Sequence, residues 1–148
     1  GNPKNVNPDD LCGLNVAVET GTVEEDAINE TAKQCKADGK KDITIQSSKQ
    51  QTDATTAVVT GKADVFFADS PVVGYAIAQT EGQLEQLGKD FDSVPNAIAI
   101  KKGDSQTTDA VQKAMQKLMD DGTYGKILQH WGVESGALDK AEINPSVG

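Results

Sequence analysis

Two short segments, far apart in the sequence, constrain the fold more than any other feature of this chain. Residues 16–22 and 63–71 each begin as an apolar run, turn polar and lead into a stretch with helical periodicity. Apolar strands that alternate with helices predict a mostly parallel sheet covered by helices, an α/β fold. The carboxyl ends of such strands share one edge of the sheet, and small ligands bind at that edge.

The same patterns predict the order of elements along the chain. We expect strands at residues 14–18, 42–46, 64–68, 84–87 and 96–100. We expect helices at residues 23–37, 50–60, 71–80, 107–120 and 123–131. Gly61 is typical of a residue that ends a helix, and Pro71 is typical of a first helical turn.

The first of the two edges offers groups that suit an anion. Thr22 lies at the start of the helix predicted at residues 23–37, and its hydroxyl could hold a carboxylate together with the amides of Thr22 and Val23. Gly21 would let a ligand approach the backbone closely. The alternative is an ordinary N-cap, in which Thr22 and Glu25 form a capping box.

The second edge offers a carboxylate, which suits a cation. Asp69, followed by Ser70, begins the helix predicted at residues 71–80 and could form a charge-assisted bond with an ammonium group. The alternative is again a helix cap, because Asp-Ser-Pro is a common way to enter a helix. Glu19, at the mouth of the first edge, either faces a ligand side chain or is a solvated charge. An edge that offers both amides and a carboxylate predicts a site for a zwitterion, and free amino acids are the commonest small zwitterions.

Cys12 and Cys35 are the only cysteines, and we expect them to form a disulfide. The strand before the helix climbs about 23 Å at ~3.3 Å per residue, and the helix descends about 22 Å at ~1.5 Å per residue. The helix end therefore returns beside the strand start. Two buried free thiols are the alternative. A disulfide indicates an oxidising compartment, and two cysteines with one distant histidine do not make a metal site.

The charge and composition of the chain exclude several functions. A formal net charge of −9 argues against nucleic acid or an anionic membrane as a partner. No apolar run is long enough to span a bilayer, and no signal peptide is present, so we expect a mature protein or a fragment of one. No nucleophile elbow, phosphate loop or histidine-rich metal spacing emerges. We therefore expect neither enzyme activity nor a cofactor.

Four motifs carry a resemblance to a known family. They are Asp10-Leu11-Cys12-Gly13, the run from Val16 to Thr22, the run from Gly61 to Pro71, and Asp121-Gly122-Thr123-Tyr124 with Trp131-Gly132. In this order they resemble the extracellular solute-binding proteins of family 3, the receptors of amino-acid ABC importers, and the last motif is very specific. The cysteine pair and the tail at residues 142–145 resemble actinobacterial members.

The resemblance implies a type II periplasmic-binding-protein fold, a two-lobed clamshell that closes on one amino acid. Residues 1–9 would form a hinge segment and residues 10–94 the second lobe. Residues 95–148 would return to a first lobe that is absent from this sequence and pack two helices on it. In such proteins the second lobe binds the ligand carboxylate at the positions of Thr22 and Val23, and the ligand ammonium at the position of Asp69.

We therefore expect the amino-acid-binding component of an ABC importer, here with half of its site. Its partners would be a polar or basic amino acid, because Glu19 would repel an acidic one, and a membrane permease. Exposed faces of the last two helices could favour a homo-oligomer or a domain swap. The expected location is extracellular or at the cell envelope, lipid-anchored or periplasmic in the full-length protein. The alternatives are a superfamily enzyme such as a dehydratase, a sensor domain, and a structural or engineered fragment that binds nothing.

Overall fold

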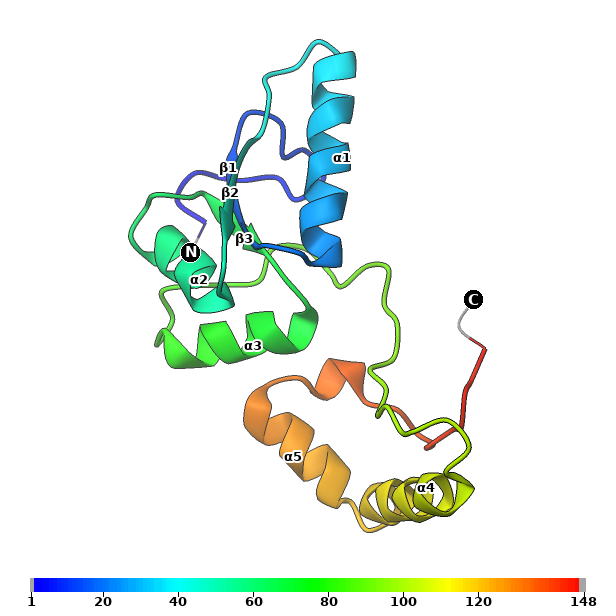
Figure 1. Cartoon of the computed structure of the whole chain (residues 1–148). Coiled ribbons are helices and arrows are strands. Elements are labelled where there is room, and N and C mark those ends of the chain that lie inside the picture. Colours follow the sequence, from blue (N-terminus) through cyan, green and yellow to red (C-terminus); the bar gives the residue numbers. More distant parts are fainter. Residues whose placement is uncertain (1, 147–148) are drawn as a thin grey trace. The chain divides into compact units, whose positions relative to one another are not determined.

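The computed structural model describes residues 2–146, and the chain divides into two compact units, Gly1–Lys89 and Asp90–Gly148 (Figure 1). The first unit contains β1 (Asn15–Glu19), α1 (Val23–Ala37), β2 (Thr44–Ser48), α2 (Gln51–Val59), β3 (Val65–Phe67) and α3 (Ser70–Gln79). The second contains α4 (Ser105–Asp120), α5 (Thr123–Trp131) and the short 3-10 helix η1 (Glu134–Gly136). Among residues 2–146, none of these helices combines the length and apolar character that a membrane span requires.

The sheet of the first unit is parallel throughout and has the order β2-β1-β3. The central strand β1 pairs Val18 with Ser47 on one side and with Phe67 on the other. All three strands therefore end along one edge, and the chain leaves that edge through the turns that open α1, α2 and α3. The predicted α/β class and the parallel, helix-covered sheet are confirmed.

Alternate side chains of β1 form the two halves of the core, as the pleat of a strand requires. Val16 and Val18 pack with Ile28 and Cys35 of α1 on one face. Ala17 packs with Ala54 of α2 and with Ala63 on the other. The three central residues of β1 are fully buried. Figure 1 shows α1 and α2 on opposite sides of the sheet.

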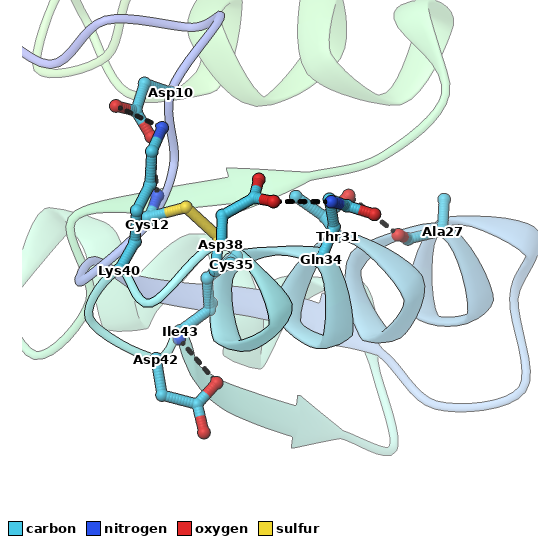
Figure 2. Close-up of a disulfide and its surroundings, with 10 residues drawn as sticks. All are labelled: Asp10, Cys12, Ala27, Thr31, Gln34, Cys35, Asp38, Lys40, Asp42 and Ile43. Carbon is cyan, nitrogen blue, oxygen red and sulfur yellow. Dashed lines mark hydrogen bonds and ion pairs between the residues drawn. A yellow bond between two sulfur atoms is a disulfide. The ribbon is translucent and has the colours of Figure 1, made fainter.

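A disulfide joins Cys12, just before β1, to Cys35, near the end of α1, as predicted (Figure 2). The two Cα atoms are 5.7 Å apart. Cys35 is 2% exposed and belongs to the core on the α1 side. Because α1 runs antiparallel to β1, this bridge closes the end of the sheet opposite to the strand-to-helix turns.

The same end of the sheet is held by Asp64, which precedes β3 and has a side chain that is 6% exposed. One carboxylate oxygen accepts hydrogen bonds from the Asn15 backbone amide, at 2.8 Å, and from the Asn15 side-chain amide, at 3.2 Å. The other oxygen pairs with the ammonium of Lys4. The backbone bond from Asn15, followed by the contact with Lys4, lowers the pKa of Asp64. Asp64 thus ties the starts of β1 and β3 to the N-terminal segment.

Two of the predicted strands, at residues 84–87 and 96–100, do not form. A strand exists through its pairing with a neighbour, and the sheet in the described part of the chain contains only β1, β2 and β3. Residues 91–99 are exposed, and Ile98 is 61% exposed. The apolar alternation at residues 96–100 is present in the sequence, but within residues 2–146 this segment pairs with no strand.

The second unit is a pair of helices with an attached tail. Residues 90–146 contain no buried side chain, whereas the first unit contains the whole buried core of the described residues. The tail is held at Ala141, whose carbonyl accepts from Gln112 and whose amide donates to Gln116, each at 3.0 Å. The Leu138 amide donates to the Tyr124 hydroxyl at 3.2 Å. The division into a hinge segment (residues 1–9), a second lobe (residues 10–94) and a return segment (residues 95–148) stays a prediction.

Candidate ligand-binding edge

The turn from β1 into α1 is closed by Thr22, which caps the helix. Its hydroxyl accepts a hydrogen bond from the Glu25 amide at 3.2 Å and donates one to the Glu19 carbonyl at 2.9 Å. Gly21 precedes it with a φ of +82°, a left-handed conformation that glycine adopts without strain. The cap proposed as the alternative role of Thr22 is therefore present, and the hydroxyl proton is already donated within the chain.

Glu25 fastens this turn to the neighbouring strand. Its carboxylate accepts from the Gly21 amide at 2.7 Å and from the Ser47 hydroxyl, at the end of β2, at 2.5 Å. The bond from Ser47, followed by that from Gly21, lowers the pKa of Glu25, so this carboxylate stays ionised at neutral pH. The turn is thus tied to β2 by a side chain rather than left as a free loop.

Three amides at the start of α1 remain without a partner. The first four N–H groups of a helix have no acceptor within the helix, and only that of Glu25 is capped here. In residues 2–146, the amides of Thr22, Val23 and Glu24 make no hydrogen bond. Consecutive N–H groups at the positive end of a helix dipole form a site that suits a carboxylate.

The turn from β3 into α3 presents the opposite charge. Asp69 stands at the N-cap position, and its carbonyl accepts from the amides of Val72 and Val73 at 2.9 and 3.0 Å. Its side chain makes no cap hydrogen bond, although aspartate is one of the best capping residues. Within the described residues this exposed carboxylate has no partner, so it is available to a cation.

The remaining predicted site residues lie along the same edge. Glu19 is the last residue of β1 and is half-buried, and Ser70 is the exposed first residue of α3. Val23 is 75% exposed, and its amide makes no hydrogen bond within residues 2–146. Because β1 and β3 are adjacent parallel strands, the amides of the first turn and the carboxylate of Asp69 follow neighbouring strand ends. The structure thus places all six predicted ligand-binding residues on one edge of one unit; that they bind a ligand stays a prediction.

Two residues of this edge escaped the sequence analysis. Ser47 supplies a hydrogen bond to Glu25, but nothing in a serine near a strand end distinguishes it from a solvated one. Glu24 is buried at the first turn of α1. Its spacing to Ile28 and Cys35, four and eleven residues along, places it on the core-facing stripe of the helix, and this periodicity was the signal that could have revealed it.

Comparison with known proteins identifies the family. Residues 12–134 match the bacterial extracellular solute-binding proteins, family 3, so most of the chain is covered and the chain belongs to this family. The arginine-binding protein ArgT of Corynebacterium glutamicum is 41% identical over 140 residues, which make up 94% of this chain and 46% of that protein. The lysine/arginine/ornithine-binding periplasmic protein of Escherichia coli is 28% identical over 88% of this chain and 51% of its own length. The chain thus spans about half the length of these relatives.

Solved structures agree with this assignment. An ancestral arginine-binding protein bound to arginine superposes with a TM-score of 0.64 at 26% identity, over 83% of this chain and 52% of that one. The ancestral amino acid-binding protein AncCDT-1, a precursor of cyclohexadienyl dehydratase, superposes with a TM-score of 0.62 at 30% identity, over 80% of this chain and 47% of that one. The predicted family and the predicted fold are confirmed.

Proposed function

We propose that this chain captures a polar or basic amino acid for an ABC importer. The ligand carboxylate would bind the free amides of Thr22 and Val23, and the ligand ammonium would bind Asp69. The observation that carries the proposal is the side chain of Asp69, which stands at a helix cap position and yet does not cap. A carboxylate without a partner and three unpartnered amides, which follow neighbouring strand ends, match the two charges of an amino acid.

The charge of the edge and the names of the relatives support a basic ligand. Glu19 and Asp69 lie at neighbouring strand ends, and an acidic ligand side chain there would meet carboxylates. Relatives are named for binding arginine and for binding lysine, arginine and ornithine. Arginine is therefore the first ligand to test, and a membrane permease is the proposed partner.

Binding rather than bond chemistry is the proposed activity. The relatives named above are binding proteins, although one structural neighbour is described as a precursor of a dehydratase. General acid–base catalysis requires a titratable group positioned on the reacting atom. Glu19 and Asp69 are titratable groups at this edge, and in this proposal they hold the positive charges of a ligand. The proposed location is the extracellular or periplasmic side of the membrane.

A thermal-shift panel tests the proposal. Each of the twenty amino acids is added at millimolar concentration to the chain, to D69N and to D53N, which removes the same charge from an exposed aspartate in the first turn of α2. A ligand at 100 times its Kd stabilises the native state by about 2.7 kcal/mol, or roughly 5–10 °C for a domain of this size. We expect arginine to raise the Tm of the chain and of D53N.

The D69N variant should respond far less. Loss of a hydrogen bond to a charged group costs about 2 kcal/mol, which is close to a 30-fold rise in Kd. If no amino acid shifts the Tm of the unmodified chain, the chain does not bind alone and the proposal is wrong for it. If D69N responds as D53N does, Asp69 does not hold the ligand.

A further inference from the structure

The side-chain amide of Gln51, the first residue of α2, has a buried nitrogen without an acceptor. Among the side chains of residues 2–146 that are not exposed, this is the one buried polar atom without a hydrogen bond. An amide nitrogen that has lost its water and gained no acceptor lowers the stability of the folded chain. A buried donor of this kind calls for an acceptor that arrives in another state of the protein.

The helix geometry shows which way Gln51 faces. Ala54 and Val58, three and seven residues further along α2, pack in the core with Ala17 of β1. This spacing places Gln51 on the same sheet-facing stripe of the helix. Helical side chains lean toward the N-terminus of their helix, and α2 begins after the carboxyl end of β2. The Gln51 side chain therefore leans toward the candidate ligand-binding edge.

Glu19 lies at that edge on the same face of the sheet. Side chains alternate along a strand, so Glu19 follows Ala17 onto the α2 side, whereas Val18 packs on the α1 side. The partner of Glu19 in β2 is Ser48, three residues before Gln51. Within residues 2–146 the half-buried Glu19 makes no side-chain hydrogen bond or ion pair. A donor without an acceptor and an acceptor without a donor thus share one face and one edge.

A bound cation would change what the Glu19 carboxylate needs. Its oxygens are not among the buried atoms without a partner, so water can bond them while no ligand is bound. A guanidinium takes two of the roughly four acceptor positions of a carboxylate and displaces water from the others. An ion pair removed from water is favourable only when its remaining acceptors also gain donors. The Gln51 amide nitrogen is such a donor.

We propose that Gln51 is a positioning residue, whose side-chain amide nitrogen donates to the Glu19 carboxylate when Glu19 holds the cationic side-chain group of a basic amino acid. The proposal rests on the proposed function and adds to it the residue that supports the charge-selecting carboxylate. Gln51 acts through Glu19 and does not itself touch the ligand, which agrees with the burial of its nitrogen.

The test is a double-mutant cycle read by arginine affinity. Arginine is titrated by calorimetry or thermal shift against the unmodified chain, Q51M, E19M and the double variant E19M/Q51M. Methionine has nearly the length of glutamine but no amide. The matched control is Q50M, which makes the same exchange at the preceding residue, an exposed glutamine whose side chain makes no cap hydrogen bond.

We expect Q51M to weaken arginine by about 10- to 100-fold, the effect of losing a hydrogen bond to a charged group. Q50M should change the arginine affinity by less than about threefold. In a chain that already carries E19M, adding Q51M should also cost less than about threefold, because the acceptor is gone. Non-additivity of this kind identifies residues that act through one another.

Three results would overturn the proposal while the unmodified chain still binds arginine. They are an equal loss from Q51M with and without Glu19, an equal affinity in Q51M and Q50M, and an E19M variant that binds as tightly as the unmodified chain. In each case the proposed site at Asp69 stands and the role of Gln51 is wrong. If the unmodified chain binds no amino acid, both proposals fail together.

Thermal unfolding without ligand is a second measurement. Because the Gln51 nitrogen is buried without an acceptor, replacing the amide by an apolar group should not destabilise the free protein. Q51M should therefore unfold at a temperature no lower than Q50M does. A markedly lower Tm for Q51M would show that the amide supports the fold of the free chain, contrary to the proposal.

Discussion

The two ends of the same three-stranded sheet are built in different ways. At the amino end, Asp64 pairs with Asn15 and Lys4, and the Cys12–Cys35 disulfide closes the unit. At the carboxyl end, three amides at the start of α1 and the carboxylates of Glu24 and Asp69 have no partner among the described residues.

This difference separates stability from binding. Polar groups that are paired contribute to the folded state, whereas groups that are left without a partner can contribute only when a ligand arrives. Substitutions at the amino end should therefore lower the free energy of unfolding and leave ligand preference unchanged. Substitutions of the unpaired groups should change ligand binding and leave the free energy of unfolding nearly unchanged.

The largest expected effect is the loss of the disulfide. The double variant C12S/C35S should lower the free energy of unfolding by about 3 kcal/mol, because the bridge closes a loop of just over twenty residues in the unfolded chain. Urea unfolding of the oxidised chain and of the double variant measures the difference. The Kd of any bound amino acid should stay within about twofold at a temperature where both proteins are folded. A much weaker ligand would show that the two ends are coupled, which contradicts the comparison.

The next effect is at Asp64. The D64A variant should lose about 2 kcal/mol of stability at neutral pH, because the amides of Asn15 lose their acceptor. The lowered pKa of Asp64 gives this contribution a pH dependence. The stabilisation is complete above the pKa of an unfolded aspartate, about 3.9, and is lost as the pH falls through the lower value of the folded state. The stability difference between the two proteins should therefore narrow below pH 4, and a difference that stays constant into strong acid would assign the effect to packing instead.

The smallest effect is at Thr22, which caps α1 and also lies on the candidate ligand-binding edge. The T22A variant should lose about 1 kcal/mol of stability, the usual value of a helix cap. Because the hydroxyl proton is donated to the Glu19 carbonyl, the ligand affinity should change by less than about threefold. The T22S variant keeps the hydroxyl and should behave like the unmodified chain. If T22A keeps its stability but loses affinity tenfold or more, the hydroxyl contacts the ligand, which is one of the two roles that the sequence left open.

The helices were predictable because their signals are local. The helix α1 begins and ends as predicted, since its capping threonine and acidic first turn lie within the sequence window itself. The strands at residues 84–87 and 96–100 were predicted wrongly. An alternation of apolar and polar residues indicates only which side chains could face a core. Whether a strand forms depends on a neighbour with free N–H and C=O groups, and no local pattern contains that neighbour.

The candidate site was predictable in position but not in detail. Sequence placed Thr22 and Asp69 on one edge because strand ends in a parallel sheet coincide. It left open whether each was a cap, and here Thr22 caps whereas the side chain of Asp69 does not. That outcome depends on the side-chain conformation and the backbone angles at each turn, which the identity of a residue does not fix.

The position of β1 in the middle of the sheet has a consequence for how the chain folds. Both β2 and β3 pair with β1 and not with each other, so neither can find its hydrogen-bonding partner before residues 15–19 are extended. We therefore expect the buried side chains of this one strand to take part in the folding nucleus. Truncation of Val16 or Val18 should slow folding, whereas truncation on the outer helix α3 should mainly speed unfolding. The strand that ends at Glu19, on the candidate ligand-binding edge, would thus also be the strand on which the rest of the unit assembles.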